Sequence, residues 1–124
     1  MNKKILIVDD SRVSRMMMRS LLGNQRPNWE IAEAAHGEEA LKLAEKTNFD
    51  VFSLDLNMPG MDGMTLLRRV KAQQTTRYLP FIMLTTEDSE QIKREGFEAG
   101  ARVWLTKPFE PLKLLDDVCK VVQP

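Results

Sequence analysis

Three aspartates and one lysine stand directly after short apolar runs of this 124-residue chain. They are Asp9, Asp10, Asp55 and Lys107. If the runs are parallel strands of one sheet, their carboxyl ends share an edge, and the four charged side chains meet there. Three carboxylates in one cleft repel one another, and protonation or a bound cation relieves that repulsion. Oxygen ligands without histidine or cysteine favour a hard ion, and Mg²⁺ suits best because it keeps several waters and accepts a phosphate oxygen.

A carboxylate beside Mg²⁺ and an ammonium group is also a plausible phosphoryl acceptor. Mg²⁺ and Lys107 would draw charge from the equatorial oxygens during an in-line transfer. Thr85 ends another apolar run, and its hydroxyl could donate to the third oxygen. The competing interpretation is a solvated rim of weak ion pairs, with a Thr85 hydroxyl that bonds only to local backbone.

The elements that must position these residues alternate along the chain. Short apolar runs are followed by segments of helical periodicity, which is typical of repeated strand–helix units in an α/β fold. The predicted strands span residues 4–9, 29–34, 51–55, 81–85 and 101–106, and helices follow each of them. Charges in 29–34 suit an edge strand, whereas the near-continuous apolar run at 51–55 suits a strand covered on both faces. Five such units predict a doubly wound parallel sheet with five helices.

Apolar residues at helical spacing predict the inner faces of the first and last helices. In the first helix these are Val13, Met17, Met18, Leu21 and Leu22, and Gly23-Asn24 indicates its end. In the last helix, which begins near Pro111, they are Leu112, Leu115, Cys119 and Val122. The helix at 89–98 has only Ile92 and Phe97 as apolar anchors, which predicts low local stability.

Composition argues against several classes of function. The 18 basic and 18 acidic residues give zero net charge, and basic residues do not cluster as nucleic-acid binding requires. The sequence shows neither a membrane-spanning stretch nor a signal peptide. Cys119 is the single cysteine, so no internal disulfide forms and the cytoplasm is the simplest location. Without a linker or repeat, residues 1–124 are expected to form one domain.

Five motifs, in this order, resemble the receiver domain of bacterial two-component response regulators. They are Val8-Asp9-Asp10-Ser11, Leu54-Asp55-Leu56-Asn57-Met58-Pro59-Gly60-Met61-Asp62-Gly63, Leu84-Thr85-Thr86-Glu87, Ala99-Gly100-Ala101 and Thr106-Lys107-Pro108-Phe109. The resemblance extends from the first predicted strand to the last helix. It implies the strand order 2-1-3-4-5 of flavodoxin-like and CheY-like folds, in which ligands bind where the order reverses, between strands one and three.

The resemblance also implies a phosphoryl-accepting site. Asp55 would accept a phosphoryl group from a phosphohistidine on a sensor histidine kinase, and Lys107 would pair with that group. Asp9, Asp10 and Asp55 would hold Mg²⁺, and Asn57 would add its backbone carbonyl to the metal ligands.

A switch would follow phosphorylation in such a receiver. Thr85 would move toward the phosphoryl group, and Trp104 would turn inward. The family usually has tyrosine or phenylalanine at the position of Trp104, so the larger indole makes this step a departure from its pattern. The Lys107–Pro108 peptide bond would be cis.

These inferences predict a phosphorylation-dependent signalling switch rather than an enzyme with independent substrate turnover. Its output would be a binding surface formed by the helix at 89–98, the strand at 101–106 and the last helix. The sequence Thr85-Thr86-Glu87 and the free-standing length are similar to chemotaxis receivers that bind the flagellar motor switch. A phosphorelay shuttle, which passes phosphate to a histidine phosphotransfer domain, is the close alternative.

Two rival functions remain. The first is a Mg²⁺-dependent phosphatase with an aspartate nucleophile, as in haloacid-dehalogenase-like enzymes. Such enzymes place a second aspartate two residues after the nucleophile as general acid. Asn57 holds that position here and cannot exchange a proton as a carboxyl group can, and no cap domain is evident. A degenerate receiver that works without phosphorylation is disfavoured, because every residue of the acidic site is retained.

Overall fold

Five strands and five helices alternate in a computed structural model that describes residues 3–122. The strands are β1 (Lys4–Val8), β2 (Glu30–Ala34), β3 (Val51–Leu54), β4 (Phe81–Thr85) and β5 (Val103–Thr106). The helices are α1 (Arg12–Gln25), α2 (Gly37–Lys46), α3 (Gly63–Ala72), α4 (Glu90–Ala99) and α5 (Pro111–Val121). Every predicted element is present, close to its predicted bounds. Among the described residues, no helix is both long and apolar enough to cross a membrane.

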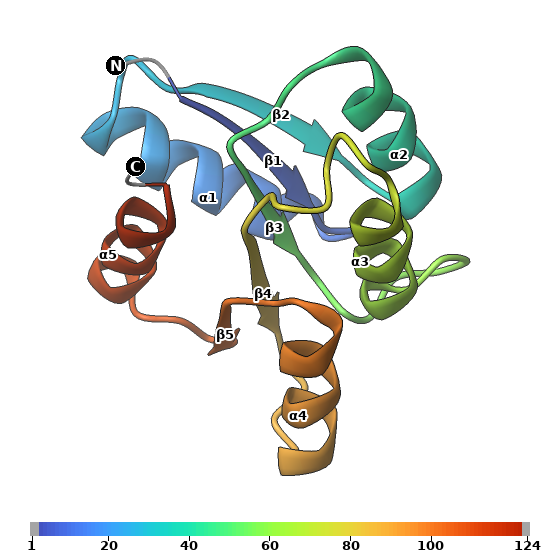
Figure 1. Ribbon diagram of the computed structural model, residues 1–124. Coiled ribbons are helices and arrows are strands. Elements are labelled where there is room, and N and C mark those ends of the chain that lie inside the picture. Colours follow the sequence, from blue (N-terminus) through green and yellow to red (C-terminus); the bar gives the residue numbers. More distant parts are fainter. Residues whose placement is uncertain (1–2, 123–124) are drawn as a thin grey trace.

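The five strands form one parallel sheet in the order β2-β1-β3-β4-β5, which confirms the predicted fold (Figure 1). The charged strand β2 lies at an edge, as predicted, and β3 and β4 are buried along their whole length. Val8 of β1 pairs with Leu54 of β3. The residues directly after this pair, Asp9 and Asp55, therefore leave the sheet side by side.

Helices cover both faces of the sheet. In Figure 1, α1 and α5 lie on one side of the strands, and α2 and α3 lie on the other. Successive residues of a strand point to opposite faces, so Ile5 and Ile7 pack in the cluster with α1 and α5, whereas Leu6 and Val8 join the other cluster. Each face thus has its own apolar core, and the loops at the strand ends remain available for polar side chains.

The predicted inner faces of α1 and α5 were partly wrong. In α1, Met18 and Leu22 are buried as predicted, but Val13 is 65% exposed and Met17 is 54% exposed. In α5, Leu112 is 69% exposed, and the fully buried residues are Leu114 and Val118. Both helices carry more apolar residues than one sheet-facing stripe accommodates, and docking on the sheet selects the stripe.

The end of α1 was also predicted too early in the chain. Gly23 lies within the helix, which continues to Gln25, and the N–H of Arg26 donates to the carbonyl of Leu22 at 2.7 Å. Glycine in a helix interior costs about 1 kcal/mol relative to alanine. The full burial of Leu22 beside it supplies packing that outweighs such a cost.

Helix α4 is held by a small interface. Gly96 is its one buried residue, Ile92 is partly buried, and Phe97, predicted as an anchor, is 47% exposed. A Cβ at Gly96 would come within 2.6 Å of the Trp104 ring. The absence of a side chain at Gly96 therefore lets α4 approach the indole on β5.

Candidate functional site

The carboxyl ends of β1 and β3 place two buried aspartates next to each other. The N–H of Asp55 donates to the carbonyl of Val8 at 2.9 Å, and the N–H of Asp9 donates to the carbonyl of Ala34 at 3.1 Å. These bonds continue the sheet by one residue, so both backbones are fixed. Asp9 is 3% exposed and Asp55 is 8% exposed.

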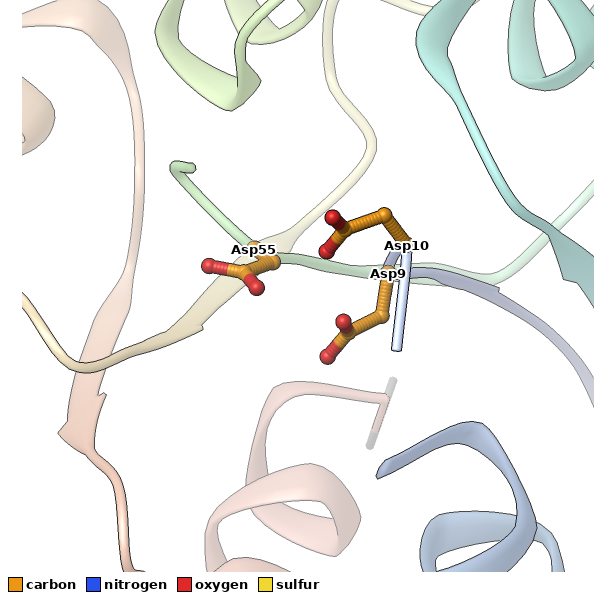
Figure 2. Close-up of side chains that lie close together, drawn as sticks. All are labelled: Asp9, Asp10 and Asp55. Carbon is orange, nitrogen blue, oxygen red and sulfur yellow. The ribbon is translucent and has the colours of Figure 1, made fainter. Parts of the chain in front are cut away.

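Asp10 completes an acidic cluster with Asp9 and Asp55. One carboxylate oxygen from each residue lies within 4.8 Å of the others. Figure 2 shows the three side chains gathered where β1 and β3 end. Asp10 is exposed, so the cluster is buried on one side and open to solvent on the other. The sequence prediction that these three carboxylates converge is confirmed.

Lys107 reaches this cluster from the end of β5. Its backbone N–H donates to the carbonyl of Thr85 at 2.8 Å, and its bond to Pro108 is cis, as the resemblance implied. The ammonium nitrogen lies 2.7 Å from Oδ2 of Asp9 and 3.3 Å from Oδ2 of Asp55. The predicted convergence of the lysine with the aspartates is therefore also confirmed.

Burial and charge shift two pKa values at the site in the same direction. Desolvation raises the pKa of Asp9, and repulsion from Asp55 adds to this, although the hydrogen bond and charge of Lys107 oppose it. Desolvation tends to lower the pKa of Lys107, but Asp9 and Asp55 outweigh it and raise that pKa. The two carboxylates keep the Lys107 ammonium group protonated, and this single positive charge does not balance the three clustered carboxylates. This imbalance favours a cation at the cluster.

The segment after Asp55 folds back against this residue. The N–H of Asn57 donates to Oδ1 of Asp55 at 3.2 Å, and the amide of Asn57 donates to Oε1 of Glu87 at 3.3 Å. At Gly63 a Cβ would collide with the backbone carbonyl of Asp55. Glycine is therefore needed there for α3 to begin directly against the site.

Thr85 at the end of β4 and Trp104 on β5 both bond Glu87, in the loop after β4. Thr85 is fully buried, and its hydroxyl accepts a bond from the N–H of Glu87 at 3.4 Å. The half-buried Trp104 donates its indole N–H to the carbonyl of Glu87 at 3.0 Å. The Thr85 hydroxyl thus bonds the local backbone, which is the alternative to phosphoryl binding given for it in the sequence analysis. Glu87 connects both predicted switch residues to Asn57.

Two residues of α1 belong to the site but were missed by sequence reasoning. The hydroxyl of Ser14 lies 3.2 Å from the ammonium nitrogen of Lys107. Arg15 donates to the carbonyl of Asp9 at 2.6 Å and to the carboxylate of Glu33 at 3.1 Å. Their position one helical turn after the acidic pair was the one available signal. A polar residue in a first helical turn is too common for that signal to identify partners distant in sequence.

Comparison with known proteins identifies the family. The model of the response regulator receiver domain matches residues 5–119. The chain belongs to the response regulator receiver family. As a receiver, it is a phosphorylation-dependent domain of two-component systems.

Individual relatives of this receiver include curated and solved proteins. The transcriptional regulatory protein ResD of Bacillus subtilis is 39% identical over 112 residues, which are 90% of this chain and 45% of ResD. The receiver thus spans less than half the length of that relative. The chemotaxis protein CheY4 of Vibrio cholerae is 41% identical, with a TM-score of 0.91 over 98% of this chain and 99% of CheY4.

A third similar structure carries an ion. The receiver domain of the sensor histidine kinase PA1611 from Pseudomonas aeruginosa is 25% identical, with a TM-score of 0.87 over 98% of each chain. Its active-site cleft coordinates magnesium.

Proposed function

We propose that Asp55 is the phosphoryl-accepting residue of this receiver and that Lys107 binds the transferred group. The observation that carries this proposal is the ammonium group of Lys107 between the carboxylates of Asp9 and Asp55, 2.7 and 3.3 Å away. Asp9 is already engaged by that ammonium group and by the N–H of Ser11 at 2.9 Å. Asp55 also accepts the N–H of Asn57 at 3.2 Å, but it follows β3, the central strand of the sheet, and at 8% against 3% it is the more exposed of the two.

The donor set at the cluster fits Mg²⁺. Asp9, Asp10 and Asp55 supply carboxylate oxygens, and the backbone carbonyl of Asn57 would be a further ligand. Hard oxygen donors with one solvent-open side suit an ion that retains several waters, and the similar PA1611 receiver holds magnesium in its cleft. When bound, Mg²⁺ would neutralise charge on the phosphoryl oxygens.

The transfer itself needs positioned groups rather than an independent enzyme activity. An oxygen of Asp55 would form a bond to phosphorus while the bond from phosphorus to the donor imidazole nitrogen breaks, and the imidazole keeps the electron pair. Lys107 would pair with one phosphoryl oxygen, where its positive charge offsets the growing negative charge. The donor would be a phosphohistidine of a sensor histidine kinase.

The output would be a binding surface formed by α4, β5 and α5. Thr85 would release the N–H of Glu87 and move toward the phosphoryl group. Because Trp104 on β5 bonds the carbonyl of Glu87, its side chain would move as well. Phosphorylation would then shift an existing equilibrium toward the partner-binding form. Helix α4, with Gly96 as its one buried residue, is suited to such a movement.

Chemotaxis is the output that we favour, with the flagellar motor switch as partner. The support is the 41% identity to the chemotaxis protein CheY4 and the sequence Thr85-Thr86-Glu87, which resembles chemotaxis receivers. A phosphorelay shuttle that donates to a histidine phosphotransfer domain is the alternative. We further propose that residues 1–124 form a single receiver domain and act in the cytoplasm.

Intact-mass spectrometry after incubation with acetyl phosphate and Mg²⁺ tests the acceptor. The wild-type chain should gain one phosphoryl group, peptide mapping should place it on Asp55, and Asp55→Asn should gain none. Asp116→Asn, at an exposed aspartate of α5, is the matched control and should react like wild type. Phosphate on another residue would refute the assignment.

Separate measurements test the metal and the output. Calorimetry should show magnesium uptake at millimolar concentrations that is lost in Asp10→Asn, and no uptake by the wild-type chain would refute the metal site. Pull-downs with a motor-switch protein and with a histidine phosphotransfer domain, with and without phosphorylation, distinguish chemotaxis from a relay. Rapid turnover of small phosphomonoesters would instead revive the aspartate-phosphatase hypothesis.

A further inference from the structure

The ammonium group of Lys107 has a third partner besides the two aspartates. It lies 3.2 Å from Oγ of Ser14, in the first turn of α1, 93 positions away in the sequence. A lysine ammonium carries three N–H donors. Asp9 after β1, Asp55 after β3 and Ser14 in α1 supply one acceptor each. All three donors are therefore used, and the orientation of the ammonium group is defined.

Ser14 is itself held firmly in place. Its backbone N–H donates to the hydroxyl of Ser11, the cap of α1, at 3.2 Å. The next residue, Arg15, joins the carbonyl of Asp9 to the carboxylate of Glu33 on β2. The first turn of α1 is thus fastened to the residues that carry the site. A hydroxyl on this turn is a fixed acceptor rather than a mobile one.

We propose that Ser14 is a positioning residue for phosphoryl transfer to Asp55. The proposal rests on the proposed function of Asp55 and Lys107 and adds a residue to it. Asp9 and Ser14 hold two N–H donors of Lys107, and the third is directed at Asp55 before transfer and at a phosphoryl oxygen afterwards. Without the hydroxyl, one donor loses its acceptor, and the ammonium group rotates about its bond to Asp9, the nearer carboxylate. It is then aimed at the reacting group for a smaller fraction of the time.

A purely structural role for Ser14 would leave different evidence. Serine in a helix commonly bonds the backbone carbonyl of the preceding turn. The hydroxyl of Ser14 instead bonds Lys107 across the site, and Ser14 is only half-buried. Its removal should therefore affect the lysine more than the helix.

The test compares three variants with the wild-type chain. Ser14→Ala removes the hydroxyl, Ser14→Thr retains one at the same position, and Ser20→Ala alters an exposed serine of the same helix as the matched control. The first readout is the ¹H–¹⁵N signal of the Lys107 ammonium group by NMR, recorded without metal or phosphodonor. This signal, assigned by its loss in Lys107→Arg, should weaken through faster water exchange in Ser14→Ala and persist in the other two variants.

The second readout is the initial rate of Asp55 phosphorylation by acetyl phosphate at saturating Mg²⁺. We expect Ser14→Ala to react about tenfold more slowly, the effect of one hydrogen bond to a charged group, and Ser14→Thr to recover most of the rate. Urea unfolding of each variant separates this loss from a loss of folded protein.

The outcomes are distinct. A wild-type rate in Ser14→Ala, or a slower rate with an unchanged Lys107 ammonium signal, would overturn the positioning role. A wild-type chain that gains no phosphoryl group on Asp55 would instead contradict the proposed function, and the ammonium signal would still report whether Ser14 holds Lys107.

Discussion

Helices α1 and α4 begin in the same way but are attached to the sheet very differently. Ser11 caps α1 and Ser89 caps α4, and each hydroxyl accepts an N–H bond from three residues further on at 3.2 Å. Along α1, Met18 and Leu22 are then buried in the core, whereas α4 buries Gly96 alone. Identical capping chemistry therefore starts two helices, and the residues beyond the cap decide how firmly each helix is attached.

The ionic contacts of the two helices show the same difference. Arg15 and Arg19 of α1 both pair with Glu33 on β2, which anchors the helix across the sheet. In α4, Lys93 pairs with Asp88, just before the helix, at 2.7 Å. Glu95 of α4 also pairs with Arg68 of α3 at 2.8 Å, but these side chains are 43% and 55% exposed, and such exposed pairs add little stability. Helix α1 is thus a fixed platform for the reacting groups. Helix α4, with few buried contacts, should open locally at a lower free-energy cost.

The largest expected effect comes from the α1 core. Leu22→Ala removes a fully buried side chain and should lower the free energy of unfolding by about 2–5 kcal/mol, the usual cost of such a cavity. Urea denaturation measures this directly. A loss well below that range would mean that α1 is no more firmly attached than α4.

The contact between α4 and Trp104 should respond next. A Cβ at Gly96 would lie 2.6 Å from the Trp104 ring, and such overpacking costs about 1–3 kcal/mol. Alanine's better helix propensity returns about 1 kcal/mol, so Gly96→Ala should be mildly destabilising. It should also shift the indole N–H resonance of Trp104, because the bond to Glu87 is disturbed.

A double-mutant cycle sharpens that prediction. In a Trp104→Phe background the outer ring is absent, so Gly96→Ala should become neutral or stabilising, and the two substitutions should show a coupling energy. Additive effects would show that α4 does not rest on the indole.

The ion pairs of α1 give a smaller effect that depends on pH. Burial opposes ionisation of Glu33, but Arg19 and Arg15 outweigh it and lower the pKa of Glu33. A lowered carboxyl pKa stabilises the fold above the unfolded-state pKa, and this stabilisation disappears as the pH falls through the folded-state pKa. Glu33→Gln should therefore cost about 0.5–1 kcal/mol at neutral pH.

Urea unfolding at neutral and acidic pH checks this sign. The stabilities of the Glu33→Gln and wild-type chains should converge below the ordinary pKa of glutamate. Glu45→Gln, at an exposed glutamate of α2, should differ little from wild type at either pH. A stability difference for Glu33→Gln that grows in acid would contradict the assignment of this network as an anchor.

The smallest effect should come from the exposed face of α4. Phe97 is 47% exposed, so Phe97→Ala should change the free energy of unfolding by no more than about 0.5 kcal/mol. The same denaturation experiment measures it beside Leu22→Ala. A loss of similar size for both would remove the contrast between the two helices.

The sheet and its acidic edge could be predicted from the sequence because both depend on local patterns. Uninterrupted apolar runs such as Val51–Leu54 indicate strands buried on both faces. A charged residue that directly follows such a run must leave the sheet at its carboxyl edge. This reasoning placed Asp9, Asp55 and Lys107 together, and it also identified β2 as an edge strand from its glutamates.

Helix faces could not be predicted with the same success. Helix α5 contains both Leu112 and Leu114, and only packing shows that Leu114 is buried while Leu112 is 69% exposed. In α1, Val13 and Met17 are apolar enough for a core but lie outside it. A helix with several apolar stripes is compatible with several orientations, and the sheet surface selects one.

The sequence alone determined the strands, their polar ends and the family to which they belong, because these depend on residues adjacent in the chain. Only the tertiary structure showed that Ser14 bonds Lys107 and that Arg15 joins Asp9 to Glu33. A side-chain hydrogen bond requires distance and direction between atoms, and for residues far apart in the chain both are set by how the helices pack on the sheet.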